Sequence, residues 1–457
     1  MAGAVVLSAH CFKGTKPMPT SFRKCRDDEF MLLPVDMRDW LPERHLAYLI
    51  RDMVREMDLS PFHSPYAGDG RRNRPYEPRM MVTVLIYAYA TGVFPSRRIA
   101  RRLHEDVAFR MLSGGSFPRH RTICGFRRRH PGDFRHLFPE VVRLAREAGM
   151  VRLGTVTVDG TKVRANASKR KAMSHGRMLT EERRLEAEIA ALPDRAGEID
   201  AGEDAVHGAD SGDGRVPEEI ARRGSRLEAI RAAKARLEAR RRAADDAKGR
   251  RPGQDRNPRG GRPYKRPHGV PEATAQENFT DPESRIMRTG AGGFRQCFNA
   301  QVAVDGGSRM IVATEVVREA GDQGRLVAMP DRVEADAGGS PDEVLADAGY
   351  CSEEELAALE ERGIMAHVAL GREGRRLAEI DGERRPATKR MAGRMAGPEG
   401  RERYARRKWM AEAPHGWIKE AMGFRRFGVR GLEKVRGEWN LVCPALNAGR
   451  MAAALAG

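Results

Sequence analysis

The sequence predicts a mixed α/β protein in which a helical region precedes the sheet and a helical hairpin interrupts it. Up to about residue 150, apolar residues recur at helical spacing. From Thr155 the pattern changes to the alternation of a strand, Thr155-Val-Thr-Val-Asp159. After a long polar stretch, strand signals return and alternate with helical segments. This order is typical of a mixed sheet that is covered by helices.

Length and composition exclude several classes of protein. The chain has 457 residues, which corresponds to about three structural units at roughly 150 residues per domain. A charged fraction of 32% excludes a collagen-like or membrane-dominated chain. The longest apolar run, around Met80–Tyr89, is well short of the roughly 20 residues that span a bilayer. The N-terminus also lacks the basic region of a signal peptide, so we expect no membrane role.

The cysteines and the net charge indicate where the protein acts. The six cysteines are scattered, and no pair has the spacing of a zinc site or a C-x-x-C motif. This usage fits a reducing compartment, and we expect a cytoplasmic protein. The net charge of +18 indicates a polyanionic partner, with DNA or RNA as the first candidate.

Residues 31–150 are predicted to form a helical domain after a weakly patterned tail of residues 1–30. Pro78 is expected to begin an apolar helix. A helix from Ser96, a glycine-containing turn over 113–115 and a short helix over 121–130 are compatible with a DNA-binding module. A helical bundle with a solvated arginine face fits the pattern equally well. The arginines concerned are Arg97, Arg98, Arg101, Arg102, Arg127, Arg128 and Arg129.

Five strands are expected in the remainder of the chain. They cover residues 155–163, 298–304, 310–317, 343–347 and 364–370. Helices are expected around Leu326–Val333, after Ser352 and over Arg401–Ala421. The pattern Ser352-x-x-Glu355 predicts a capping box. Three antiparallel strands followed by alternating units imply a mixed sheet.

An insertion, residues 168–275, separates the first strand from the second. Apolar residues at a and d spacing predict two antiparallel helices, with a loop over Pro193–Pro217 between them. These residues are Met178, Leu185, Ile189, Leu192, Ile220, Leu227, Ile230 and Leu237. A flexible basic segment, Lys248–Pro271, is expected to follow.

Two carboxylates stand out because of their positions in this order. Asp159 lies on the first strand and Asp347 ends the fourth. If these strands are neighbours, the two side chains share one end of the sheet and repel unless a cation or a proton lies between them. Mg²⁺ takes one or two carboxylates per ion, and two ions about 3.5–4 Å apart can clamp a phosphoryl group. A lone aspartate at a strand end is more often a turn former, so the hypothesis depends on both residues.

Short motifs follow one another along the chain in a characteristic order. The first domain contains Tyr76-x-Pro-Arg-Met80, Glu105-Asp-Val-Ala-Phe109 and Phe126-Arg-Arg-Arg-His130. The core contains Val158-Asp-Gly-Thr-Lys162, Asn299-Ala-Gln-Val-Ala-Val-Asp305 and Ala346-Asp-Ala-Gly-Tyr350. The C-terminal part contains Glu412-x-x-x-Gly416-x-Ile-Lys419. Together these motifs resemble bacterial insertion-sequence transposases of the DDE class, over nearly all of residues 33–450 except the insertion.

The resemblance implies a ribonuclease-H-like catalytic core formed by residues 151–167 and 276–421, with a C-terminal helical segment over 422–457. It also implies a catalytic and metal-binding triad of Asp159, Asp347 and Glu412 that holds two Mg²⁺ ions, which Mn²⁺ could replace. Glu412 precedes Lys419 by seven residues, two helical turns, which puts both on one helix face.

The activity implied by the resemblance is DNA transposition. Such a protein binds double-stranded DNA at the terminal inverted repeats of its own element, joins two ends as a homodimer, and transfers a freed 3′-hydroxyl to target DNA. The residues expected to contact DNA are Tyr404, Arg407, Lys419, Lys162, Arg97, Arg98, Arg127, Arg128, Arg425, Arg426 and Arg430.

Other interpretations stay open at this stage. A catalytically inactive DNA-binding protein derived from a transposase has the same motifs, and a basic coiled-coil protein could use the insertion for its interactions. A ribonuclease H-type nuclease shares the fold, although the helical N-terminal domain favours a transposase. His120, His130 and His415 are predicted to be solvated or to contact phosphates. Trp417 and Trp439 are predicted to pack in the core rather than to stack on bases.

Overall fold

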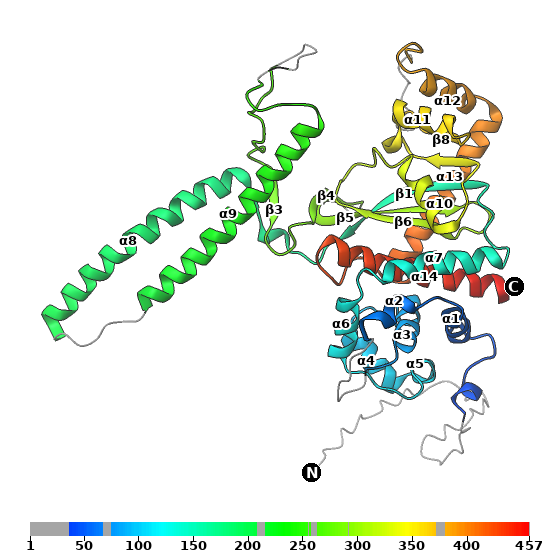
Figure 1. Cartoon of the computed structure of the whole chain (residues 1–457), viewed down its shortest axis with the longest axis horizontal. Coiled ribbons are helices and arrows are strands. Elements are labelled where there is room, and N and C mark those ends of the chain that lie inside the picture. Colours follow the sequence, from blue (N-terminus) through cyan, green and yellow to red (C-terminus); the bar gives the residue numbers. More distant parts are fainter. Residues whose placement is uncertain are drawn as a thin grey trace, which may run out of the picture.

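The computed structural model describes residues 36–66, 75–207, 215–254, 256, 263–290, 292–371 and 380–456. A helical region, a body built on a sheet and a long projecting helical hairpin can be followed in Figure 1. The tail predicted over residues 1–30 lies outside the described residues. No helix in the described part is both long and apolar enough to cross a membrane.

The N-terminal region is helical, as predicted. Its elements are η1 (Met37–Trp40), α1 (Leu46–Arg55), α2 (Ser60–His63), η2 (Ser64–Tyr66), α3 (Pro78–Ala90), α4 (Ser96–Glu105), α5 (Val107–Leu112), α6 (His120–Arg129) and α7 (Phe134–Glu147). Helix α3 begins at Pro78, and the Glu77 carboxylate caps it by accepting from the Arg79 and Met80 amides. This helix is apolar on almost every side because it packs between α1, α5 and α14 (Leu432–Ala456).

The central sheet is mixed, with the order β4-β5-β1-β7-β8, and β6 also pairs with β5. Strand β1 pairs antiparallel with β5 and parallel with β7, and β7 pairs parallel with β8. All five predicted strands are present, and β4 is an additional strand that the sequence did not predict. The strands are β1 (Thr155–Arg164), β4 (Arg285–Arg288), β5 (Phe294–Asp305), β6 (Ile311–Val317), β7 (Glu343–Ala346) and β8 (Met365–Val368).

Helices cover the sheet and complete a continuous core. Helix α10 (Ala328–Ala337) and α14 pack on β6, while α13 (Pro398–Gly416) contacts β1, β5, β7 and β8. Side chains alternate along β1, so Val156 and Val158 are fully buried while the Thr157 hydroxyl meets Met410 of α13. Asp159 follows with the same period and therefore lies on the α13 face of the sheet. The body also contains η4 (Ala348–Tyr350), α11 (Glu353–Glu361), α12 (Pro386–Ala396) and the π-helical turn η5 (Trp417–Ala421), and the short η3 (Lys169–Lys171) follows β1.

The insertion forms an antiparallel hairpin of α8 (His175–His207) and α9 (Arg215–Ala247), which projects to the left in Figure 1. Met178 and Leu185 pack against Leu227, Ile230 and Leu237, as the a and d spacing predicted. The loop predicted over 193–217 is wrong for residues 193–207, which continue α8, because extending a helix that has already formed adds one backbone hydrogen bond for each residue that is ordered. Two short strands, β2 (Ala172–Ser174) and β3 (Gln276–Asn278), pair at the base of the hairpin.

Two further local predictions are corrected. Ser352 precedes α11 without a side-chain capping bond. The Glu355 carboxylate instead accepts from the Gly324 and Val327 amides (3.0 and 3.2 Å), because these donors before α10 come within its reach. In the segment predicted to be flexible, the Gly269 amide donates to Asp245 of α9 (2.9 Å), so this part of it is held against the hairpin.

A buried polar cluster joins the helical region to the C-terminal helix. The carboxylate of Glu438, on α14, is 2% exposed and forms an ion pair with Arg127 of α6. Tyr89 of α3 donates to the same carboxylate (2.8 Å), and so does the Gly428 amide (2.6 Å). Three segments that are far apart in the sequence therefore depend on one buried charge.

We expect Glu438→Ala to lower the free energy of unfolding by about 3–5 kcal/mol, because it leaves the Arg127 guanidinium buried without a countercharge. Urea denaturation measures this loss. Glu186→Ala is the control, because its ion pair with Arg231 is exposed and should contribute less than about 1 kcal/mol. A loss for Glu438→Ala no larger than that of the control would contradict the interpretation.

Candidate active site

The parallel pairing of β1 with β7 brings two aspartates to one end of the sheet. Thr157 pairs with Leu345, so the same register continued by two residues places Asp159 beside Asp347. Neighbouring strands lie about 4.8 Å apart. Asp347 immediately follows β7, and its Oδ1 accepts from the Gly349 amide (2.8 Å), which starts the turn η4. The structure therefore brings together the two carboxylates that the strand order had suggested.

The environment of Asp159 disfavours its negative charge. Burial raises the pKa of this carboxyl to about 6, since only 19% of the side chain is exposed. The nearby charges of Asp347 and Asp322 raise this pKa further, while Arg407 opposes them. Because Asp347 and Asp322 both destabilise the ionised form of the buried Asp159, a cation bound here would stabilise that form.

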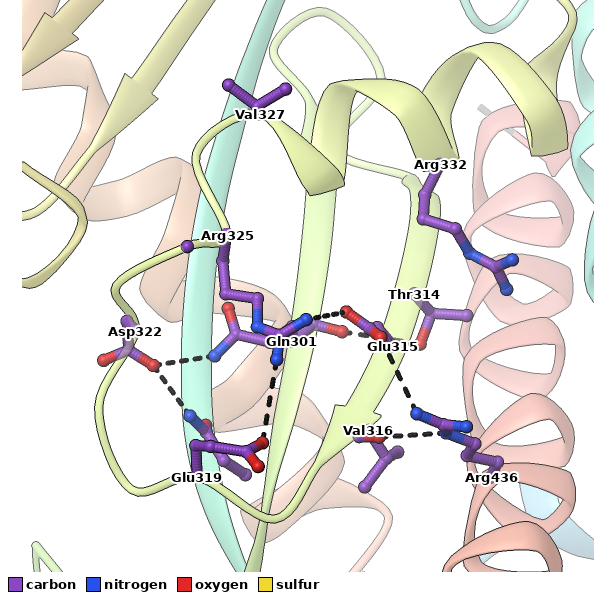
Figure 2. Close-up of polar contacts among 12 residues, drawn as sticks. Gln301, Thr314, Glu315, Val316, Glu319, Asp322, Arg325, Val327, Arg332 and Arg436 are labelled. Carbon is purple, nitrogen blue, oxygen red and sulfur yellow. Dashed lines mark hydrogen bonds and ion pairs between the residues drawn. The ribbon is translucent and has the colours of Figure 1, made fainter. Parts of the chain in front are cut away.

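Asp322 was not predicted as part of the site. It lies on the connection between β6 and α10, and its Oδ1 accepts from the side-chain amides of Asn299 and Gln301 (2.7 Å each), as Figure 2 shows for Gln301. Lys162 lies 3.4 Å from the same oxygen. Arg325 of this connection also pairs with Glu315 of β6 (3.1 Å), which helps to hold it against the sheet (Figure 2).

The second carboxylate oxygen of Asp322 lies near Gly349, two residues after Asp347. A Cβ atom at Gly349 would lie 3.5 Å from Oδ2 of Asp322 and 3.0 Å from Oδ1 of Asp347. The two oxygens thus border the same small space, which a glycine leaves open. The sequence motifs include Asn299-x-Gln301. They do not reveal that the two side-chain amides bind Asp322, because Asp322 lies in a loop outside the motif.

Helix α13 and the following turn supply the positive and the neutral groups. The positive charge of Arg407 lowers the pKa of Asp159. The Arg407 guanidinium lies over the Tyr404 ring, with 5.7 Å from its central carbon to the ring centroid. Lys419 lies in the π-helical turn η5 and donates to Thr161 of β1. Burial lowers the pKa of Lys419, and the charge of Asp159 partly offsets this effect.

His415 also points to Asp159 and corrects the prediction of a solvated or phosphate-contacting histidine. Its Nε2 lies 3.5 Å from Asp159 Oδ2, and only 9% of its side chain is exposed. Burial and the neighbouring Lys419 lower the pKa of His415 to about 3, so the ring is neutral at physiological pH. His130 is buried as well, because its ring packs against Phe62 and Phe126, and it hydrogen-bonds Asp133 (2.6 Å).

Glu412 is placed differently from the two aspartates. It is exposed on α13, and among the described residues it forms no hydrogen bond or ion pair. Met410, Ala411 and His415 are buried toward the sheet, and a helix turns about 100° per residue, so Glu412 lies away from that face. Nowhere in the described ranges are three or more His, Cys, Asp or Glu side chains arranged to hold a metal ion.

The eight arginines predicted to contact DNA differ in exposure. Arg127 is mostly buried with Glu438, Arg407 of α13 is half-buried, and the other six are exposed. Those six are Arg97, Arg98, Arg128, Arg425, Arg426 and Arg430. The prediction of core packing is confirmed for Trp439, which is fully buried, and is wrong for Trp417, which is 59% exposed because it begins the π-helical turn on the outer side.

Two protein-family profiles match the chain. A transposase domain (DUF772) covers residues 35–129, and a transposase DDE domain covers residues 268–448. The chain belongs to the insertion-sequence DDE transposases. No curated protein and no solved structure matches it significantly.

The DDE profile of this transposase includes only part of the candidate active site. The matched DDE range includes Asp322, Asp347 and Glu412, while Asp159 lies before it. The family consists of enzymes that cleave and transfer DNA, generally with divalent metal ions. The register of β1 and β7 supplies the link between Asp159 and the matched range.

The network around Asp322 requires a residue without a side chain at position 160. A Cβ atom there would lie 2.2 Å from Gln301 Nε2 and 2.8 Å from Asp322 Oδ1. We expect Gly160→Ala to lower the free energy of unfolding by about 1–3 kcal/mol and to displace these polar groups. Thermal and urea unfolding measure the loss.

Gly154→Ala is the matched control. It immediately precedes the same strand, and its Cβ would meet nothing closer than Asp342 Oδ2 at 3.9 Å. Equal effects of the two substitutions would show that the crowding at position 160 is not important.

Proposed function

We propose that this transposase binds the inverted-repeat ends of its element and performs Mg²⁺-dependent cleavage and strand transfer at Asp159 and Asp347. The observation that carries the proposal is the parallel register of β1 and β7, which sets Asp347 beside a largely buried Asp159. Arg407 and Lys419 lie on the same side of the sheet and add the positive charge that a DNA strand needs.

The residues fit a divalent cation. Mg²⁺ keeps several waters and takes one or two carboxylates, which matches the two neighbouring aspartates. Burial raises the pKa of Asp159, so a cation there offsets a charge that the fold alone disfavours. When bound, such ions supply Lewis-acid stabilisation of phosphoryl oxygens. We propose two Mg²⁺ ions, replaceable by Mn²⁺, held by Asp159 and Asp347, with Asp322 and Glu412 as the candidates for a further carboxylate.

The cations around the carboxylates would hold the DNA strand. Lys419 lies near Asp159 on the α13 face of the sheet, and Lys162 lies near Asp322 on the other face, so phosphate oxygens of a strand that crosses this end of the sheet can contact them. Arg407, stacked on Tyr404, has a planar guanidinium suited to bidentate phosphate contact. The exposed Arg97, Arg98 and Arg128 would add affinity for the backbone, which should fall with salt. Because two ends must be joined, we propose a homodimer on DNA.

A second function is favoured by one observation. Glu412 lies on the outer side of α13, so an inactive DNA-binding protein derived from a transposase is the alternative. A metal-dependent nicking assay on duplex DNA that carries the element's own ends separates the two functions. Nicking supports the enzyme, and binding without nicking supports the alternative.

We expect Asp159→Asn to lower Mg²⁺-dependent nicking at least about a hundredfold, because it removes one of the two adjacent carboxylates. DNA affinity should stay unchanged, and the rise in melting temperature on adding Mg²⁺ should disappear. Asp342→Asn is the matched control, because it removes an exposed charge next to β7. Wild-type rates of nicking in Asp159→Asn would refute the assignment.

The third carboxylate can be identified without DNA. We expect Asp322→Asn to weaken the Mg²⁺-induced rise in melting temperature, because Oδ2 of Asp322 already borders the same space as Asp347. The asparagine can still accept from Asn299 and Gln301, so the fold should be retained. Glu412→Gln should leave this rise unchanged, since its side chain is exposed. If Glu412→Gln weakened the Mg²⁺-induced rise in melting temperature and Asp322→Asn did not, Glu412 would be the third carboxylate instead.

A further inference from the structure

A strongly basic cavity lies where the helical hairpin leaves the body. Its volume is about 700 Å³, and six cationic side chains but no carboxylate line it. These side chains are Arg164, Lys169, Arg170, Arg177, Arg295 and Arg426, and all six residues are exposed. They come from the end of β1, the segment before β2, the start of α8, the start of β5 and the segment after η5.

The cations of this basic cavity are not neutralised by ion pairs, although Arg177 lies close enough to Glu181 of α8 for its charge to lower the pKa of that carboxyl. Within the described part of the chain, none of the six forms an ion pair. The arginines along the hairpin differ, because Arg184 and Arg226 pair with Glu181, and Arg231 pairs with Glu182 and Glu186. Like charges gathered in a concave surface repel one another, and a bound anion relieves that repulsion.

The backbone forces these arginines together. The Phe427 amide donates to the Arg164 carbonyl (2.9 Å), and Arg164 and Arg426 form a parallel bridge. The Ala165 amide donates to the Gln296 carbonyl (2.8 Å), which places Arg295 next to them. The fold therefore holds Arg164, Arg295 and Arg426 close together, although they are far apart in the sequence.

The basic cavity and the candidate active site lie along the same strands. Cys297 of β5 is the pairing partner of Arg164, and its thiol is buried. Burial raises the pKa of this thiol to about 11, and four cations oppose the rise. Two of these, Arg164 and Arg295, line the cavity, and the other two, Lys419 and Lys162, belong to the site. Five residues of β1 separate Asp159 from Arg164, which is roughly 17 Å at about 3.4 Å per residue.

We propose that the basic cavity binds the phosphodiester backbone of duplex DNA about five base pairs from the phosphate held at Asp159 and Asp347. A strand rises about 3.4 Å per base pair, so the 17 Å separation corresponds to roughly half a helical turn. Such contacts position the duplex without reading its sequence. A neighbouring cavity shares Arg426 and includes Arg128 of α6, so positive charge continues to the helical region. The inference rests on the proposed function.

The test compares two triple variants of the full-length protein that remove the same charge. The cavity variant is Arg170→Ala, Arg177→Ala and Arg295→Ala. The control variant is Arg184→Ala, Arg226→Ala and Arg231→Ala, whose side chains are ion-paired on the hairpin. The probe is a labelled DNA duplex of about three helical turns, and binding is measured over a series of salt concentrations.

For the cavity variant, the slope of log affinity against log salt should decrease in magnitude by about 2–3, close to one unit for each phosphate that the protein no longer neutralises. The control variant should keep the wild-type slope. Replacing the same three cavity residues by lysine should also keep the slope, which separates loss of charge from damage to the fold. A wild-type slope for the cavity variant, or an equal decrease in the control, would overturn the inference.

Nicking by the wild-type protein distinguishes this result from a failure of the proposed function. If wild-type protein nicks DNA while the cavity variant keeps its slope, only the basic cavity is refuted. If wild-type protein does not nick DNA but the cavity variant has a smaller slope of log affinity against log salt, the basic cavity is supported as a DNA-binding site and the proposed enzyme activity is refuted.

Discussion

The parallel pairing of β1 with β7 is the constraint on which the rest of the site depends. It places Asp159 and Asp347 one strand spacing apart, where their negative charges repel. Burial makes the repulsion more costly, as the raised pKa of Asp159 reflects. The surrounding residues accommodate this unfavourable arrangement. Gly349 leaves space beside Asp347, Gly160 leaves room for the side chains that bind Asp322, and Lys419 and Arg407 bring positive charge.

The same sheet connects the chemistry to the surfaces that can hold DNA. Strand β1 runs from the aspartates to Arg164 at the basic cavity. The buried ion pair of Arg127 and Glu438 joins α6 to α14, which packs on the sheet. Helix α6 also lines the neighbouring cavity that contains Arg128 and Arg426. Cations on the helical region and in the basic cavity thus keep defined positions relative to the carboxylates, as alignment of a duplex on a reacting phosphate requires.

Much of this architecture follows from local patterns in the sequence. Strand alternation predicted β1, a short strand was expected over 343–347 where β7 lies, and the strand order suggested that Asp159 and Asp347 meet. Proline at position 78 predicted the start of α3. These predictions succeeded because the information lies within one segment, in side-chain period or in the preference of one residue for a helix terminus.

Other features depend on contacts between distant segments and could not be predicted. Asp322 is a loop residue whose role becomes visible only through the Asn299 and Gln301 amides. The sequence spacing put Glu412 and Lys419 on one face of a regular helix, but the π-helical turn η5 breaks that regularity, so Lys419 reaches Thr161 while Glu412 stays exposed. Glu355 likewise caps donors before α10 instead of its own helix.

The central claim, that Asp159 and Asp347 share a divalent cation, can be tested by replacing Mg²⁺ with Fe²⁺ and generating hydroxyl radicals at the bound metal. The chain should be cut beside Asp159, beside Asp347 and in the connection that contains Asp322, and Mg²⁺ should suppress these cuts. Cuts confined to other segments, or cuts that Mg²⁺ does not suppress, would contradict a shared metal site at this end of the sheet.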